Sequence, residues 1–65
     1  MKIRVNGQEH DLATDRLSHL LTALDYEGDW LATAVNGDLV HAQDRDDFKL
    51  KEFDRIEVLS PMQGG

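Results

Sequence analysis

The sequence contains no cysteine, one proline, one Trp, one Tyr and two Phe in 65 residues. Without cysteine there can be no disulfide, no thiolate zinc site and no catalytic thiol, and the composition fits a reducing compartment. A domain of this size buries only about 60% of the surface that its unfolded chain exposes. Small domains often add disulfides or a metal for support. This one must depend on a single thin hydrophobic core.

Basic residues are also few. Seven Lys and Arg stand against thirteen Asp and Glu, which gives a formal net charge of −6. Phosphate backbones repel such a surface, so we expect no nucleic-acid partner. The acidity suits a partner with a basic docking surface, and it also serves simply to keep a small domain in solution.

Long apolar runs are missing too. The opening residues, MKIRVNGQEH, alternate between apolar and polar side chains. That pattern is unlike a signal peptide or a membrane span. We therefore expect a cytoplasmic protein that does not associate with membranes.

Two Asn-Gly pairs mark tight turns. Such a pair favours a type I′ hairpin because both central residues need a positive φ. Asn6-Gly7 separates a strand at 1–5 from a polar return strand at 8–13, which we place at a sheet edge. Asn36-Gly37 separates a strand at 31–35 from one at 38–41. In 31–35 both sets of alternate residues are largely apolar, so the pattern does not determine which face of this strand points inward.

Between the hairpins the period changes to that of an amphipathic helix. The pattern predicts a helix over 14–25, with Thr14 or Asp15 as its cap and Gly28 as the exit of the chain. The apolar stripe of this helix is formed by Leu17, Leu20, Leu21 and Leu24.

The last third of the sequence ends in another strand. Residues 42–54 read as a loop or short helical turn that packs Phe48 and Leu50 beneath the core. A strand at 55–60 then places Ile56 and Val58 on one face and Leu59 on the other. Pro61 cannot donate a ladder hydrogen bond and ends that strand.

These elements predict an α+β domain in which one helix covers one face of a mixed sheet of four to five strands. If the first and last strands lie side by side, the helix crossover lets them run parallel. Outward Lys2 and Arg4 would then approach Glu57. We divide the chain into a folded domain at 1–60 and a flexible C-terminal tail at 61–65.

No catalytic or metal site is expected. The histidines fall in different elements without metal-ligand spacing, and the acidic knot lacks the glycine and closing glutamate of a calcium loop. Neither Ser18 nor Ser60 has a nucleophile-elbow context. The histidines are His10, His19 and His41, and the knot is Asp44, Asp46 and Asp47.

Four stretches together carry a family resemblance: VNG near the start, LLTAL in the helix, AVNGDLV in the middle and DRIEVLSPMQGG at the end. Their order and spacing resemble the ubiquitin-like β-grasp sulfur carriers, and within them the ThiS family of thiamine biosynthesis. Two positions depart from that pattern. Phe53 stands where the family usually has glycine, and Tyr26 lies where small or polar residues are common.

The resemblance implies a β-grasp fold and a carrier that is a protein co-substrate and not an enzyme. An adenylating enzyme that resembles the ubiquitin-activating enzymes (ThiF-like) would use ATP and magnesium to activate the carboxylate of Gly65. A persulfide donor would then supply sulfur, and the resulting thiocarboxylate would serve a thiazole synthase (ThiG-like). The chain itself would bind no cofactor.

The tail would deliver its carboxylate into a partner's active site. Residues 61–65 span at most about 16 Å when extended. Gly64, which has no Cβ, would let the backbone enter a narrow channel. Leu59, Met62 and Gln63 are the expected partner-binding residues beside it.

Other functions remain open on the sequence alone. The small subunit of molybdopterin synthase uses the same kind of terminal thiocarboxylate, and a ubiquitin-like modifier would join Gly65 to lysines on its targets. A β-grasp interaction module that carries nothing would have the two glycines only as a disordered end.

Overall fold

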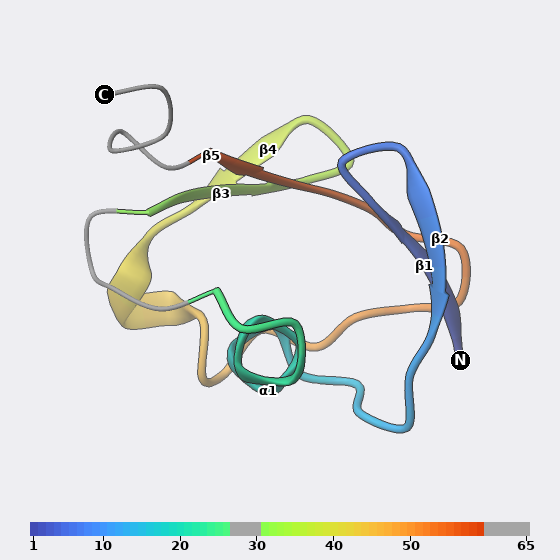
Figure 1. Ribbon diagram of the computed structural model, residues 1–65. Helices are drawn as coiled ribbons and strands as arrows, with labels where there is room; N and C mark the ends of the chain where they lie inside the picture. The colour runs from blue at the N-terminus through green and yellow to red at the C-terminus, as the bar shows by residue number, and fades with distance from the viewer. Residues whose placement is uncertain (27–30, 60–65) are drawn as a thin grey trace.

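The computed structural model describes residues 1–26 and 31–59. These residues form five strands, one α-helix and one turn of 3-10 helix (Figure 1). In chain order they are β1 (Lys2–Val5), β2 (Gln8–Asp11), α1 (Leu17–Ala23), β3 (Ala32–Val35), β4 (Asp38–Val40), η1 (Ala42–Asp44) and β5 (Arg55–Leu59).

The strands form one mixed sheet in the order β2-β1-β5-β3-β4. β1 and β5 are parallel neighbours, whereas the other pairs are antiparallel. The central strand, β5, is therefore the last of the described strands in chain order. The predicted α+β class, the parallel pairing of the first and last strands and the edge position of 8–13 are confirmed.

Both Asn-Gly turns form as predicted. Asn6 and Gly7 have φ of 50° and 84°, and Asn36 and Gly37 have φ of 53° and 88°. Positive φ at both central residues defines the type I′ turn, whose twist matches that of the flanking strands. These turns fix the register of both hairpins, with Val5 opposite Gln8 and Val35 opposite Asp38.

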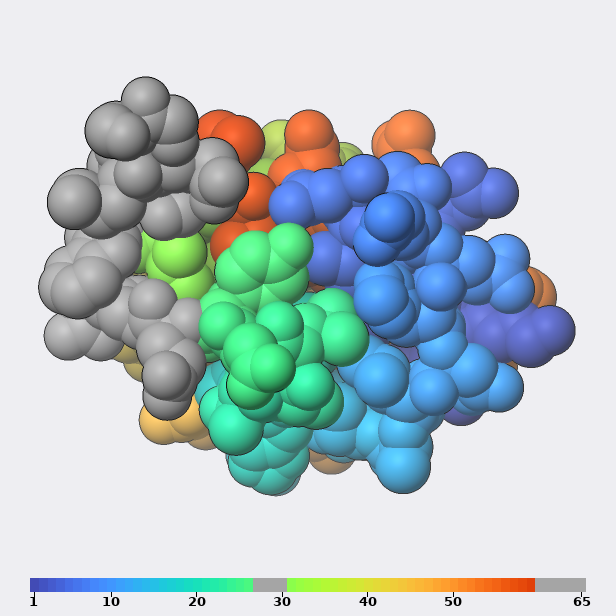
Figure 2. All heavy atoms as spheres, viewed as in Figure 1, coloured from blue at the N-terminus to red at the C-terminus, as the bar shows by residue number. Residues whose placement is uncertain are grey.

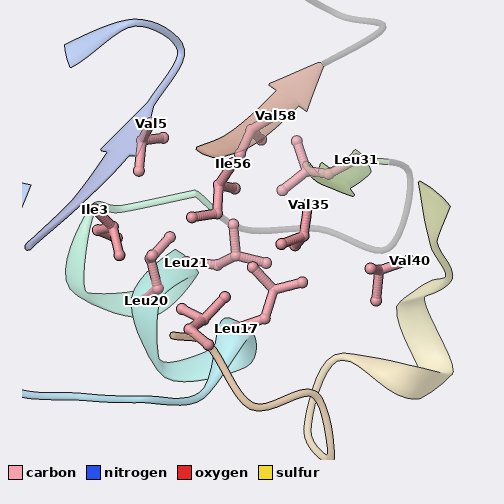
Figure 3. Packing of buried hydrophobic residues seen from close by; sticks show 11 residues of the cluster. Ile3, Val5, Leu17, Leu20, Leu21, Leu31, Val35, Val40, Ile56 and Val58 are labelled. Carbon is pink, nitrogen blue, oxygen red and sulfur yellow. The ribbon is translucent and has the colours of Figure 1, made fainter. Parts of the chain in front are cut away.

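The sheet curves over α1, which lies against its concave face (Figure 1). Apolar side chains from β1, β5 and β3 point toward the leucine stripe of the helix (Figure 3). As predicted, Leu17, Leu20 and Leu21 are buried, and Leu24 packs half-buried against them. The sheet contributes Ile3, Val5, Val35, Val40, Ile56 and Val58 to this core. Leu31, just before β3, and Leu50, from the loop before β5, complete it.

The structure resolves which face of β3 points inward. Leu31, Thr33 and Val35 are buried, whereas Ala32 is exposed and Ala34 half-buried on the opposite face. A strand covered on both sides would bury the alanines as well. β3 is thus covered on one face only, and small side chains line its outer face.

The helix starts later than predicted. It begins at Leu17, and Arg16 occupies the cap position without a side-chain hydrogen bond. Thr14 accepts a hydrogen bond from the backbone N–H of Arg16 at 3.2 Å and does not cap the helix. The first N–H groups donate instead to carbonyls of the 42–54 loop, Leu17 to Phe48 at 3.1 Å and Ser18 to Arg45 at 3.2 Å. Carbonyls about thirty residues away thus accept hydrogen bonds from the first N–H groups of the helix, which Thr14 or Asp15 was expected to cap.

The helix also ends earlier than predicted, and not at Gly28. Asp25 adopts the left-handed conformation with a φ of 64°. Its N–H donates to the Thr22 carbonyl at 3.2 Å, while Tyr26 N–H donates to the Leu21 carbonyl at 2.8 Å. This pair of bonds is a Schellman motif, which usually places glycine where Asp25 stands. Gly28 lies outside the described residues.

The 42–54 loop contains the predicted short helical turn, η1, and buries Leu50 and half-buries Phe48, as expected. It also contains a buried arginine that the sequence pattern did not indicate. Arg45 is 7% exposed. Its Nε donates to Thr33 Oγ1 at 3.0 Å, and its Nη2 donates to the Leu31 carbonyl. Arg45 therefore fastens this loop to β3.

Glu57 forms no ion pair with Lys2 or Arg4 in the described residues, although Arg4 and Glu57 line the same hollow as expected of neighbours. The register of β1 and β5 places Arg4 directly opposite Arg55. Among residues 1–26 and 31–59 the ion pair present is between the Met1 amino group and Asp11, at 3.2 Å. Val5, the last residue of β1, pairs with Ile56, so Glu57 lies beyond the end of β1.

Candidate functional site

An apolar groove lies on the outer face of the sheet, opposite the helix. It has a volume of about 140 Å³. Leu39 and Leu59 form its raised sides and are 62% and 69% exposed. The groove is lined by Ala32, Thr33, Ala34, Leu39, Glu57 and Leu59.

Strand alternation produces this groove. Ala32 pairs with Leu59, and Ala34 lies between Leu39 on one side and Glu57 on the other. Two small side chains between two leucines leave a low floor with higher walls. Exposed apolar surface of this kind marks interaction sites in small proteins. The expectation that Leu59 presents apolar surface on the outer sheet face is confirmed.

The end of β5 is held on both of its edges. On one edge Val58 and Leu59 pair with Thr33 and Ala32 of β3. On the other edge β1 has already ended, and the Asn6 side chain bonds to β5 in its place. Asn6 Nδ2 donates to the Val58 carbonyl at 3.1 Å, and Val58 N–H donates to Asn6 Oδ1 at 2.9 Å.

Asn6 also reaches the exit of the helix, because its Nδ2 donates to the Tyr26 hydroxyl at 3.3 Å. Three segments therefore meet at one side chain: the β1–β2 turn, the segment after α1 and the end of β5. The sequence pattern predicts only a turn at Asn6 and gives no indication of these contacts. The turn alone accepts Asn, Asp or Gly, so nothing in its pattern pointed to the side chain.

The remaining predicted site residues follow Leu59 in the sequence. Met62, Gln63, Gly64 and Gly65 lie outside the described residues, so their roles remain predictions. Leu59 is the one predicted site residue that the structure describes. Leu59 lines the groove and is the residue immediately before that segment in the sequence.

The other candidate residues do not come together. His10 lies in β2, His19 in α1 and His41 just before η1. Within the described part of the chain, no three His, Cys, Asp or Glu side chains form a possible metal site. Ser18 has its hydroxyl buried in the helix without a hydrogen-bond partner, and Ser60 lies outside the described part.

The space-filling view along the helix axis shows how closely the helix and the N-terminal hairpin pack (Figure 2). The segment that joins β2 to α1, in light blue, fills the space between the N-terminal hairpin and the helix. None of the helices in 1–26 and 31–59 is long and apolar enough to cross a membrane. The apolar groove lies on the outer face of the sheet, and no helix within the described residues covers it.

Comparisons with known proteins agree with this architecture. The ThiS family model matches residues 3–65. The crystal structure of a thiamine biosynthesis protein (ThiS) from Geobacter metallireducens is 26% identical, with a TM-score of 0.82, and the match covers 100% of both chains. No curated protein matches the chain. The match confirms the predicted β-grasp fold, and with the family model extending over nearly the whole sequence, the chain belongs to the ThiS family.

Proposed function

We propose that this chain is a sulfur carrier of thiamine biosynthesis, which carries sulfur on the C-terminal carboxylate of Gly65. It acts as a co-substrate of other enzymes and performs no catalysis itself. The observation that carries the proposal is the family match, which extends through Gly65. The absence of cysteine fits as well, because the chain has no thiol on which to hold sulfur.

The proposed chemistry begins with activation of the carboxylate. A free carboxylate is a poor electrophile. An adenylating enzyme of the ThiF-like kind therefore joins Gly65 to AMP, using ATP with magnesium and releasing pyrophosphate. The terminal sulfur of a persulfide displaces AMP and forms an acyl disulfide with its carrier. A thiol reductant then cleaves the sulfur–sulfur bond and leaves a thiocarboxylate on Gly65.

The thiocarboxylate donates its sulfur to a thiazole synthase of the ThiG-like kind. Each transfer requires the last carbonyl to enter another protein's active site. Gly64 serves this entry, because the absence of a Cβ permits a narrow channel and conformations closed to other residues. A side chain at this position would collide with the channel walls.

The apolar groove is the proposed docking surface for these partners. Leu39 and Leu59 offer exposed apolar area beside the start of residues 60–65. Docking there brings the following residues near the partner's active site. We assign Met62 and Gln63 to the same contact, since they come between the groove and the reacting end in the sequence.

Intact-mass spectrometry tests the proposal directly. The purified chain is incubated with ATP, magnesium, a ThiF-like adenylating enzyme, a persulfide and a thiol reductant. We expect the mass gain of one oxygen-to-sulfur exchange, located at Gly65 by fragmentation. A chain with one alanine added after Gly65 is the control and should remain unmodified. An unmodified wild-type chain, with an enzyme that activates its own carrier, would contradict the proposal.

A deletion strain separates the two cofactor pathways. Removal of the gene should make growth depend on added thiamine or its thiazole precursor. Molybdoenzyme activity should stay at the level of the parent strain. The opposite pattern would assign the chain to molybdopterin synthesis.

A further inference from the structure

The side chain of Asn6 makes the hydrogen bonds to β5 that a further residue of β1 would otherwise make. β1 pairs with β5 through Arg4 opposite Arg55 and Val5 opposite Ile56. The backbone N–H of Asn6 adds one more bond to the Ile56 carbonyl at 2.9 Å, and then the chain turns away. Beyond that point the edge of β5 would lack a partner from β1.

The Asn6 carboxamide fills that position because it presents a donor and an acceptor to Val58, as a peptide group would. It bonds to the Val58 carbonyl at 3.1 Å and to the Val58 N–H at 2.9 Å. The pairing of β5 on this edge thus extends to Val58, one residue before Leu59. It does so without any further residue of β1.

We propose that Asn6 is a positioning residue for delivery of the Gly65 carboxylate, an inference that rests on the proposed function. Residues 60–65 start directly after Leu59, so the fixed end of β5 is the base from which they extend. Each residue released from the sheet increases the number of conformations that must be searched before the carboxylate reaches the active site. Asn6 limits that number by holding Val58.

The second hairpin offers a matched comparison. Asn36 has nearly the same φ as Asn6 and also occupies a type I′ turn. Its Oδ1 accepts from Arg55 N–H at 2.9 Å, and its Nδ2 donates to Asp54 at 2.9 Å. Asn36 therefore holds the start of β5, whereas Asn6 holds the end. The two side chains differ in which end of the same strand they fix.

The test compares Asn6→Gly with Asn36→Gly. Glycine suits both positions of a type I′ turn, so each variant keeps its hairpin and loses the bonds of one side chain. Asn6→Gly loses those to Val58 and Tyr26, and Asn36→Gly loses those to Arg55 and Asp54. Steady-state adenylation is measured with a ThiF-like enzyme, at a temperature where both variants are folded by circular dichroism. We expect kcat to fall about tenfold for Asn6→Gly, because misplacement of a reacting group costs rate, with KM little changed. For Asn36→Gly we expect a change of less than about twofold.

Asn6→Asp is the intermediate variant. It keeps the turn and the acceptor for Val58 N–H but loses the donor for the Val58 carbonyl. Its kcat should lie between those of wild type and Asn6→Gly. Amide hydrogen exchange gives a second readout: Val58 N–H should exchange faster in Asn6→Gly and unchanged in Asn36→Gly.

Equal kcat values for Asn6→Gly and Asn36→Gly would overturn this role for Asn6, and so would a loss confined to KM. If Asn6→Gly does not fold, the kcat values of Asn6→Asp and Asn36→Asp are compared, and equal values would again overturn this role for Asn6. A wild-type chain that is not adenylated overturns the proposed function, and with it this role. A wild-type chain that is adenylated while the two glycine variants behave alike overturns only the role of Asn6.

Discussion

Arg45 and Thr33 form a hydrogen-bonded pair inside the protein, with Arg45 Nε 3.0 Å from the Thr33 hydroxyl oxygen. The same hydroxyl donates to the Val40 carbonyl at 2.7 Å. The two bonds connect the loop before β5 to both strands of the second hairpin. A buried charge is tolerated when it is hydrogen-bonded, and here two neutral oxygens, of Thr33 and Leu31, accept bonds from the guanidinium.

Replacing Arg45 with alanine should therefore destabilise the fold substantially. The change removes both hydrogen bonds of the guanidinium and leaves a cavity beside Thr33. We expect a loss of about 2–4 kcal/mol in the free energy of unfolding, measured by urea denaturation. Thr33→Val removes only the hydroxyl and should cost less, about 1–2 kcal/mol. Equal stability of Arg45→Ala and wild type would contradict a structural role for this bond network.

Phe53 is the position where the family resemblance led us to expect glycine, and its backbone explains why. Its φ is 69°, and its side chain is 74% exposed. An aromatic residue in the left-handed region is strained, with little packing in return. Phe53→Gly should raise the free energy of unfolding by about 1 kcal/mol. Phe53→Ala, which keeps a Cβ, should show little or no gain in the same denaturation series.

Asp25 makes a similar prediction at the end of the helix. It has a φ of 64° in a Schellman motif, a position that favours glycine. Aspartate tolerates this conformation better than an aromatic residue does, so the gain should be smaller. We expect Asp25→Gly to stabilise the protein by about 0.5 kcal/mol and Asp25→Ala to destabilise it. Thermal unfolding followed by circular dichroism separates these outcomes, and a lower melting temperature for Asp25→Gly would contradict the motif.

Ser18 carries a buried hydroxyl without a hydrogen-bond partner. Its backbone N–H, which bonds to the Arg45 carbonyl at 3.2 Å, is not affected by a side-chain change. Ser18→Ala removes the unsatisfied oxygen and introduces a better helix former. The variant should be more stable by about 0.5–1 kcal/mol in urea denaturation. A loss of stability would indicate that the hydroxyl has a partner, such as a water molecule.

The proposed docking groove predicts an effect on partner binding without an effect on folding. Leu59→Lys places a charge on the groove wall, where the side chain is already exposed. The free energy of unfolding should change by less than about 0.5 kcal/mol. The KM for adenylation should rise about tenfold, equivalent to about 1.4 kcal/mol of binding. Gln43→Lys, which adds the same charge on exposed η1, is the control. The same rise in KM for both variants would show that the added charge, and not the change in the groove, weakens binding.

The parts of the fold that were predicted correctly depend on neighbouring residues in the sequence. The Asn-Gly turns require positive φ at two adjacent positions, and the leucine stripe needs only its own spacing. The inward direction of Ile56 and Val58 follows from alternation along one strand. Leu59 was placed on the outer face by the same argument.

The parts that were missed depend on residues distant in the chain. Carbonyls of Phe48 and Arg45 satisfy the start of the helix, so no cap was needed at Thr14 or Asp15. The register between β1 and β5 is set by how the whole sheet packs, which is why Arg4 faces Arg55. In the same way, the turn pattern identified Asn6, but only the folded chain brings its amide to Val58.

The position of β5 has a consequence for synthesis of the protein. The centre of the sheet is formed by β5, which lies between β1 and β3 and leaves the ribosome after the other four described strands. Until that strand arrives, the two hairpins have no common partner, and their apolar faces cannot close around the helix. The protein thus cannot complete its fold on a chain truncated before β5. A copy that displays the folded sheet with its apolar groove has therefore been translated at least through Leu59.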